Sequence, residues 1–385
     1  MKKRLLFFNV VVLFICFYLT GCDLATEQNR KAAWDETRFG PGGGYDCDGL
    51  AIGTCKGDGV NRIYVTHNII GYENDKIFEY TFQSGQWKGD LIHTSQSTNS
   101  IQSIRTGNAR NDGMQRLYFD QYNMTPPVSC SLHELTFSEG DWELCTVDSV
   151  PGGRGSLRNT FTLGAGRQDG VQRIYWIAEN GHIREYTYVD SAWSCELLGP
   201  AGQEPLDDLV IGTARNDGIN RMYAGSHSGH IYEFDYAAGE WAISDIGMIK
   251  YDVWPNDFIS LAAGSGRSDG VHRIYAGIGQ HDGFWEFSYH SDGFWEKDSL
   301  KGCGDVEDLT IGSGKNDAIH RVYIAGDGGN LREYRFLNNA WELTTHFSAT
   351  SFFTEVTVGR ARDDTRKRVY GATTAGYVYE YTYQP

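Results

Sequence analysis

The stretch Gly212-Thr-Ala-Arg215-Asn-Asp217-Gly-Ile-Asn-Arg221-Met-Tyr223 decides the fold, because its pattern recurs seven times along the chain. The pattern is Gly-x-x-(Arg/Lys)-x-Asp-x-x-x-Arg, followed by an apolar residue and a tyrosine. Successive copies of its aspartate lie 47 to 57 residues apart. Repeats of this length without a helical pattern are typical of four-stranded propeller blades. The aspartates are Asp58, Asp112, Asp169, Asp217, Asp269, Asp317 and Asp364.

Each unit divides into four predicted strands around this stretch. In the unit of Asp217, the apolar residues 209–211 form the first strand, and residues 221–224, which alternate in character, form the second. A glycine-containing turn leads to the third strand at residues 231–236, and Trp241 opens the fourth. We therefore predict an all-β, seven-bladed β-propeller with four-stranded blades over residues 33–385.

A tryptophan opens the fourth strand in six of the seven units. The last unit stops at Pro385, before any fourth strand, while residues 32–35 around Trp34 are similar to residues 339–342. We predict that the N-terminal strand near Trp34 completes the last blade and closes the ring, which leaves no open edge between the first and last blades. The six other tryptophans are Trp87, Trp142, Trp193, Trp241, Trp295 and Trp341.

Each unit also carries a glutamate in its third strand, which we expect to face the second-strand arginine across the hairpin between them. Because a catalytic carboxylate is rarely needed seven times, we interpret these residues as structural ion pairs. The pairs are Arg62 with Glu79, Arg116 with Glu134, Arg173 with Glu185, Arg221 with Glu233, Arg273 with Glu286, Arg321 with Glu333 and Arg368 with Glu380.

The unit resembles the FG-GAP or VCBS repeat of integrin-α-type and bacterial extracellular propellers, over roughly residues 33–385. In that family the loop Asp-x-Asn-x-Asp-Gly-x-x-Asp often holds calcium. Here the last ligand position is the second-strand arginine, and only the third keeps its aspartate. Calcium needs six to eight oxygens, so we predict no metal and no cofactor. The second ligand position is Lys56, Arg110, Arg167, Arg215, Arg267, Lys315 or Arg362.

We predict instead that this loop Arg or Lys bonds the loop aspartate of its own or an adjacent blade, in place of the ion. Asp46-Cys47-Asp48-Gly49 is an isolated Asp-x-Asp-Gly and the one weak candidate for a metal site.

The first residues read as a targeting segment. Lys2, Lys3 and Arg4 precede an apolar run over residues 5–18, and Leu19-Thr-Gly-Cys22 resembles a bacterial lipobox. The resemblance implies a signal peptide at residues 1–21, a lipidated Cys22 with a short tether over residues 22–32, and a lipid anchor on the extracytoplasmic side of a bacterial cell envelope, periplasmic or at the cell surface. Asp23 resembles an enteric inner-membrane retention signal, but the choice of membrane stays open.

Export makes disulfides possible. Cys130 and Cys145 flank a predicted hairpin and are the best candidate pair, while Cys47 and Cys55 flank one strand and are a weaker one. The formal charge of −16 argues against a nucleic-acid partner, which would need a basic face.

The loops between second and third strands, and between fourth and first strands, share one face and vary in length. We therefore predict that this face binds the ligand. Acidic residues just before the first strands are expected at the channel mouth on the same face. The candidate ligand-binding residues are Tyr122, Trp176, His227, Tyr251, Trp254 and His281, with the acidic Asp208, Asp308 and Glu355.

Three functions fit this arrangement. A non-catalytic binding module for a glycan or a protein is favoured, because exposed aromatic residues suit sugar rings and protein hot spots. A carbohydrate-active enzyme, either a glycosidase or a polysaccharide lyase, is an alternative that would use the channel-mouth carboxylates. A scaffold subunit of an envelope assembly is the other.

Overall fold

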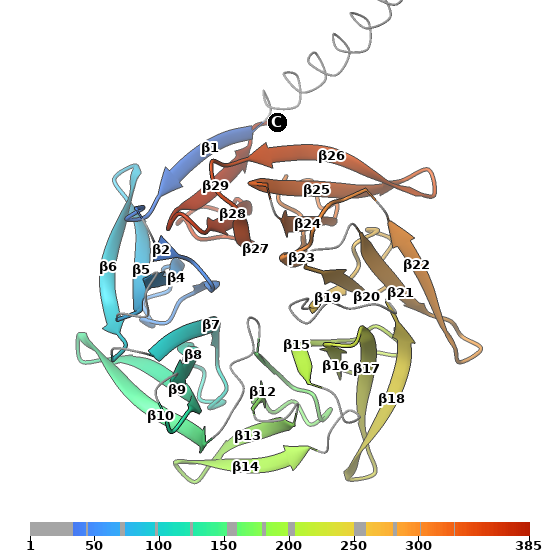
Figure 1. Ribbon diagram of the computed structural model, residues 1–385, viewed down its shortest axis with the longest axis horizontal. Helices are drawn as coiled ribbons and strands as arrows, with labels where there is room; N and C mark the ends of the chain where they lie inside the picture. The colour runs from blue at the N-terminus through green and yellow to red at the C-terminus, as the bar shows by residue number, and fades with distance from the viewer. Residues whose placement is uncertain are drawn as a thin grey trace, which may run out of the picture.

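The computed structural model describes residues 34–43, 45–69, 74–96, 99–123, 126–151, 160–178, 182–198, 205–249, 259–279, 283–300, 302–326 and 328–385. Seven antiparallel sheets form the blades of a propeller around a central axis (Figure 1), which confirms the predicted fold. The predicted signal peptide, Cys22 and the tether lie outside the described residues. Within these ranges no helix is long and apolar enough to cross a membrane.

The strands follow one another from the axis to the rim in each blade, and blades are numbered here from the unit of Asp58. The innermost strands are β3 (Leu50–Gly53), β7 (Asn99–Gly107), β11 (Phe161–Gly164), β15 (Leu206–Gly212), β19 (Ile259–Gly264), β23 (Asp308–Gly312) and β27 (Phe353–Gly359). The second strands are β4 (Arg62–Ile69), β8 (Arg116–Asn123), β12 (Arg173–Ile177), β16 (Arg221–Ser226), β20 (Arg273–Ile278), β24 (Arg321–Gly326) and β28 (Arg368–Thr373).

The outer half of each blade is a hairpin. The third strands are β5 (Lys76–Gln83), β9 (Ser129–Ser138), β13 (Ile183–Val189), β17 (His230–Ala237), β21 (Phe284–Tyr289), β25 (Asn330–Leu337) and β29 (Val378–Tyr383). The outermost strands are β6 (Gln86–Thr94), β10 (Asp141–Pro151), β14 (Ala192–Leu198), β18 (Glu240–Met248), β22 (Trp295–Leu300), β26 (Ala340–Ser348) and β1 (Trp34–Phe39). A short strand, β2 (Tyr45–Asp46), also pairs with β4.

The ring closes between the two ends of the chain. Strand β1 pairs antiparallel with β29, from Trp34 opposite Tyr383 to Phe39 opposite Val378. Figure 1 shows β1 lying outside β29 at the junction of the first and last colours. The predicted completion of the last blade by the segment near Trp34 is therefore confirmed.

Aromatic contacts between neighbouring blades explain why the Trp and Tyr positions repeat. The outer-strand Trp142 meets the second-strand Tyr64 of the preceding blade edge-on, with ring centroids 6.0 Å apart. Trp193 meets Tyr118 in the same way at 6.3 Å. This T-shaped geometry is favourable for aromatic pairs. Trp34 is part of the buried cluster that includes Tyr323 of the sixth blade, so the N-terminal strand reproduces the contact of its counterparts.

The predicted disulfide between Cys130 and Cys145 is wrong, because both thiols are free. In the β9–β10 ladder Cys130 lies opposite Val150, and Cys145 lies opposite Glu134. Four residues along a strand span ~13 Å, which is beyond the reach of a disulfide. The hairpin turns between Ser138 and Asp141, so the two cysteines lie at different distances from its turn. Cys47 and Cys55, the weaker candidate pair, are also free and buried.

Candidate functional site

Each loop between a first and a second strand is closed by its own aspartate and arginine. In the third blade, Arg173 donates from Nη1 to Asp169 Oδ1 at 2.8 Å and from Nη2 to Asp169 Oδ2 at 2.6 Å. The main-chain N–H of Val171 donates to the same carboxylate at 3.0 Å. The hydrogen bond from Arg173 lowers the pKa of Asp169 to about 2. The other six blades have the same ion pair.

The prediction that the loop Arg or Lys bonds this aspartate is wrong, since these cations bond the third-strand glutamate. Lys56 Nζ lies 2.6 Å from Glu79 Oε1, and Lys315 Nζ lies 2.7 Å from Glu333 Oε1. The aspartate already holds a bidentate guanidinium, whereas the glutamate is buried and needs a counter-charge. The other pairs are Arg110 with Glu134, Arg167 with Glu185, Arg215 with Glu233, Arg267 with Glu286 and Arg362 with Glu380.

The second-strand arginine approaches the same glutamate from the other side. In six blades its Nε lies 3.4 to 3.8 Å from the glutamate Oε1, so each predicted pair is present at longer range. The fourth blade differs, because Arg221 Nε lies 3.2 Å from Asp235 while Glu233 bonds Arg215. The glutamates are therefore shared between two cations in most blades.

Each loop cation also lies over an aromatic ring of the following blade. The Arg110 guanidinium carbon is 4.4 Å from the ring centroid of Tyr188, and Arg167 is 4.6 Å from that of Tyr236. Cation–π contacts of this kind are attractive. The remaining contacts are Lys56 over Phe137, Arg215 over Tyr289, Arg267 over Phe336, Lys315 over Tyr383 and Arg362 over Phe82.

The loops between first and second strands lie on one face of the propeller, which we call the clasp face. Hydrogen bonds from asparagine side chains to the main chain of the neighbouring loop complete it. Asn111 Nδ2 donates to the carbonyl of Gln172 at 3.0 Å, and Gln172 N donates back to Asn111 Oδ1 at 2.7 Å. Asn216 makes the same double contact with His272. The polar groups of the clasp face are thus committed largely to contacts within their own blade and to contacts with the neighbouring blade.

The described residues contain no group of three or more His, Cys, Asp or Glu side chains that could hold a metal ion. In Asp46-Cys47-Asp48-Gly49, the Asp48 carboxylate accepts a hydrogen bond from Asn68 Nδ2 at 2.5 Å. The carboxylate of this motif therefore contributes to the contact between β4 and the segment before β3.

On the opposite face, here the loop face, the structure describes two of the predicted candidates, His227 and Tyr122. His227 follows β16 with its side chain one-third exposed, and its Nδ1 lies 3.6 Å from Asp207 Oδ1. Tyr122 lies near the end of β8, partly buried against the cluster between the second and third blades. Trp176 was predicted to lie on a loop of this face. It is instead buried inside β12, opposite Phe161. Tyr251, Trp254 and His281 lie outside the described residues.

The innermost strands surround a central cavity of about 650 Å³ that opens to solvent. Asp208, Asp308 and Glu355 line it, and their exposed fractions are only 2%, 7% and 3%. These three residues were predicted just before the first strands, at the channel mouth, but they lie within β15, β23 and β27 and are buried in the channel wall.

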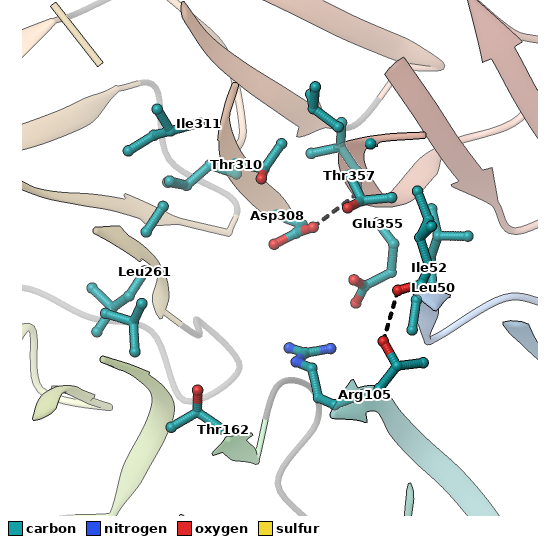
Figure 2. A pocket seen from close by; sticks show the side chains of 18 of the residues that line it. Leu50, Ile52, Arg105, Thr162, Leu261, Asp308, Thr310, Ile311, Glu355 and Thr357 are labelled. Carbon is teal, nitrogen blue, oxygen red and sulfur yellow. Dashed lines mark hydrogen bonds between the residues drawn. The ribbon is translucent and has the colours of Figure 1, made fainter. Parts of the chain in front are cut away.

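Two of these carboxylates connect neighbouring blades. Asp208 Oδ2 accepts from the main-chain N–H of Leu261 in the next blade at 2.6 Å. Asp308 Oδ2 accepts from that of Val356 at 2.8 Å (Figure 2). Each innermost strand is the edge of its sheet. Its N–H groups that point away from the sheet therefore need partners other than a neighbouring strand. Burial raises the pKa of both aspartates above the usual range.

Arg105 was missed by the sequence analysis. It projects into the cavity from β7, on the side of Asp308 and Glu355 (Figure 2). Arg105 lies opposite Tyr118, and the corresponding inner-strand residues of the other blades are uncharged. The sequence signal that could have identified it is that this repeated position holds an arginine in one unit and uncharged residues in the other six. Those uncharged residues are Ala51, Thr162, Val210, Ala262, Thr310 and Thr357.

Comparisons with known proteins support the fold alone. No protein-family profile and no curated protein matches the sequence. A structure of BBS1N in complex with ARL6DN is similar with a TM-score of 0.59 and 12% identity, over 91% of this chain and 97% of that one. A protein from Lactobacillus plantarum is similar with a TM-score of 0.55 and 13% identity, over 78% of this chain and 84% of the other. The chain is thus a seven-bladed β-propeller protein.

Proposed function

We propose that the chain is a membrane-anchored, extracytoplasmic binding module that holds a glycan or a protein at its loop face. The observation that carries the proposal is the difference between the two faces. On the clasp face, loop side chains such as Arg110 and Asn111 are engaged within and between blades. The loop face lacks this repeated network among its described residues and has the loops that vary, and variable loops on a rigid scaffold are typical binding surfaces.

The proposed anchor rests on the lipobox-like residues before Cys22. Residues 23–33 would span at most ~40 Å when extended, so the propeller would stay close to the bilayer. The resemblance of the repeat to FG-GAP propellers agrees with an extracytoplasmic position. The acyl chains on Cys22 would supply the attachment.

The channel carboxylates give the enzyme alternative less support than the two faces give the binding module. Asp208 and Asp308 accept main-chain N–H groups of the next blade, so moving either toward a substrate would leave a buried donor unsatisfied. A protein ligand or an assembly partner remains compatible with the fold, since BBS1N is a propeller of similar structure in complex with ARL6DN.

The test uses the full-length lipoprotein in detergent micelles, on a glycan array and in affinity capture from envelope extracts. We expect His227→Ala and Trp254→Ala to weaken binding of the recovered ligand by at least about tenfold. Trp254 is chosen because the sequence assigns it to a fourth-to-first-strand loop. Met114→Ala on the clasp face is the control, since Met114 is 40% exposed, and should change binding less than about twofold.

Binding that is lost in Met114→Ala but unchanged in both loop-face variants would contradict the proposed face. Turnover of a polysaccharide that disappears in Asp308→Asn would favour the enzyme instead. Co-purification with a membrane complex that none of these variants alters would favour the scaffold.

A further inference from the structure

A small pocket, here called the rim pocket, lies between the outermost strands of the last two blades. Strands β26 and β1 are neighbours at the rim of the ring (Figure 1), and residues of both line the pocket. Its volume of about 160 Å³ has room for about five water molecules at ~30 Å³ each. Sites for whole drug-sized ligands are larger, so the rim pocket fits one chemical group of a ligand.

One buried hydroxyl at the rim pocket has no partner among the described residues. It belongs to Tyr381, which lines the pocket and is only 1% exposed. Glu36, another lining residue, lies directly opposite Tyr381 in the β1–β29 ladder, so both side chains are on the same side of the sheet. Burial raises the pKa of Tyr381, and the nearby charge of Glu36 raises it further. Since buried hydroxyls are normally hydrogen-bonded, a group bound in the pocket is the expected partner.

The third blade shows how the same hydroxyl is satisfied elsewhere in the ring. Tyr186 also comes directly after a third-strand glutamate, and its hydroxyl donates to Asp148 Oδ2 of the preceding blade at 2.7 Å. The sixth-blade residue equivalent to Asp148 is Phe347, because each lies opposite the leucine two residues before the glutamate. The Phe347 and Tyr381 rings pack with their centroids 4.1 Å apart. An aromatic ring thus replaces the acceptor between the last two blades.

The lining favours a neutral group with a hydrogen-bond acceptor and an apolar end. The Tyr381 hydroxyl can donate to a carbonyl oxygen. Trp34 and Phe347, whose ring centroids are 5.1 Å apart, both line the pocket and offer apolar surface to a methyl group. A charged group would lose its hydration beside these rings, which is costly. An acetamido group, CH3–CO–NH–, has the acceptor and the methyl group and carries no charge.

We propose that the rim pocket binds an acetamido group, whose carbonyl oxygen accepts a hydrogen bond from Tyr381 and whose methyl group packs against Trp34 and Phe347. The group belongs to an N-acetylated amino sugar or to an N-acetyl amino acid, and the rest of either molecule lies outside the pocket. The rim pocket is on the side of the ring and not on the loop face, so this inference does not depend on the proposed function.

The test is isothermal titration calorimetry of the full-length protein in detergent micelles with N-acetylglucosamine. Glucose lacks the acetamido group and glucosamine has an ammonium group in its place, so each should bind at least about tenfold more weakly. N-acetylglycine amide distinguishes the two sources. Weaker binding than that of N-acetylglucosamine indicates that the sugar ring contributes and that the ligand is an amino sugar, whereas equal or tighter binding indicates an N-acetyl amino acid.

Two matched variants connect the affinity to the rim pocket. Tyr381→Phe removes only the hydroxyl and should weaken N-acetylglucosamine at least about tenfold. It should not lower the Tm, because no described residue bonds this hydroxyl. Tyr186→Phe is the control: it removes the equivalent hydroxyl, which is bonded to Asp148, so it should lower the Tm and leave the affinity unchanged. Saturation-transfer NMR should identify the acetyl methyl group as the part of the ligand in closest contact with the protein.

The proposal would be overturned if N-acetylglucosamine bound no better than glucose, or if none of these ligands bound, because the pocket would then hold water only. Equal affinities of the wild type and Tyr381→Phe would also overturn it, since the ligand would then bind elsewhere. His227→Ala on the loop face should leave the affinity for N-acetylglucosamine unchanged. Failure of this inference is therefore distinguishable from failure of the proposed function.

Discussion

Arg173 shows how one side chain can make two contacts of very different energetic weight. Its partner Asp169 keeps 42% of its side chain exposed, whereas Glu185 keeps 1%. Water screens the first pair, and exposed pairs contribute about 0–1 kcal/mol. The buried carboxylate of Glu185 depends on its cations, because an uncompensated buried charge is strongly destabilising. Six other blades repeat the exposed Asp–Arg pair.

Arg173→Met should lower the free energy of unfolding by about 3 kcal/mol, and Asp169→Asn by about 1 kcal/mol or less. Urea unfolding followed by tryptophan fluorescence measures both. Similar losses in the two variants would contradict the assignment of the main contribution to the buried contact.

Acid pH separates the exposed contact from the rest. The pKa of Asp169 is lowered from 3.8 to about 2 by the hydrogen bond from Arg173. Its contribution is therefore present above pH 4 and is lost as the pH falls toward 2. The stability difference between the wild type and Asp169→Asn should shrink over this window. The raised pKa values of Asp208 and Asp308 act in the opposite direction, but equally in both proteins.

At the level of elements, the outer strand of the last blade differs from the other six. Strand β1 covers the edge of β29 without being connected to it by a turn, whereas β6 continues from β5 through a two-residue turn. The attachment of β1 therefore rests on the strand pairing and on the packing of Trp34 against Phe347 and Tyr383. If β1 detaches, β29 becomes an exposed edge that can pair with another molecule.

Trp34→Ala should lower the free energy of unfolding by about 3 kcal/mol and produce concentration-dependent oligomers in size-exclusion chromatography. Trp87→Ala is the matched control: it removes the corresponding side chain from β6 and should destabilise the protein while leaving it monomeric. Oligomers in both variants, or in neither, would show that the detached strand is not the cause.

For the whole molecule, the seven clasps form a ring that stabilises the contacts between all neighbouring blades. Each contains a loop cation bonded to a glutamate of its own blade and placed over an aromatic ring of the next, as Arg110 is placed over Tyr188. These cations occupy the loop positions that calcium ligands hold in the propellers that the repeat resembles. If these loops hold no metal ion, as the sequence predicts, the loop cations supply the positive charge beside each glutamate.

Removing divalent ions should therefore leave the protein unchanged. We expect the same Tm in EDTA, in buffer alone and in excess calcium, because no bound ion would be lost or gained on unfolding. Differential scanning fluorimetry measures this, with Lys56→Met as a control that should lower the Tm by removing one clasp. A marked, EDTA-sensitive shift of the Tm in the wild type would contradict the assignment of the clasps.

The sequence by itself determined the number of blades, the order of their strands and the closure by the segment near Trp34. These properties follow from short-range patterns that recur about every fifty residues. It also identified the cations and carboxylates of the clasps, because each blade repeats them.

Only the tertiary structure decided which of these charges meet. The repeat places a loop cation and a second-strand arginine near every third-strand glutamate. The packing of the buried glutamate decides which cation is closer, as Lys56 is to Glu79. Trp176 and the cysteines were misjudged for a related reason, since strand bounds and register decide burial and reach. The cavity lined by Arg105, Asp308 and Glu355 forms because strands that are far apart in the sequence meet at one axis. No local sequence pattern shows which of their side chains come close together there.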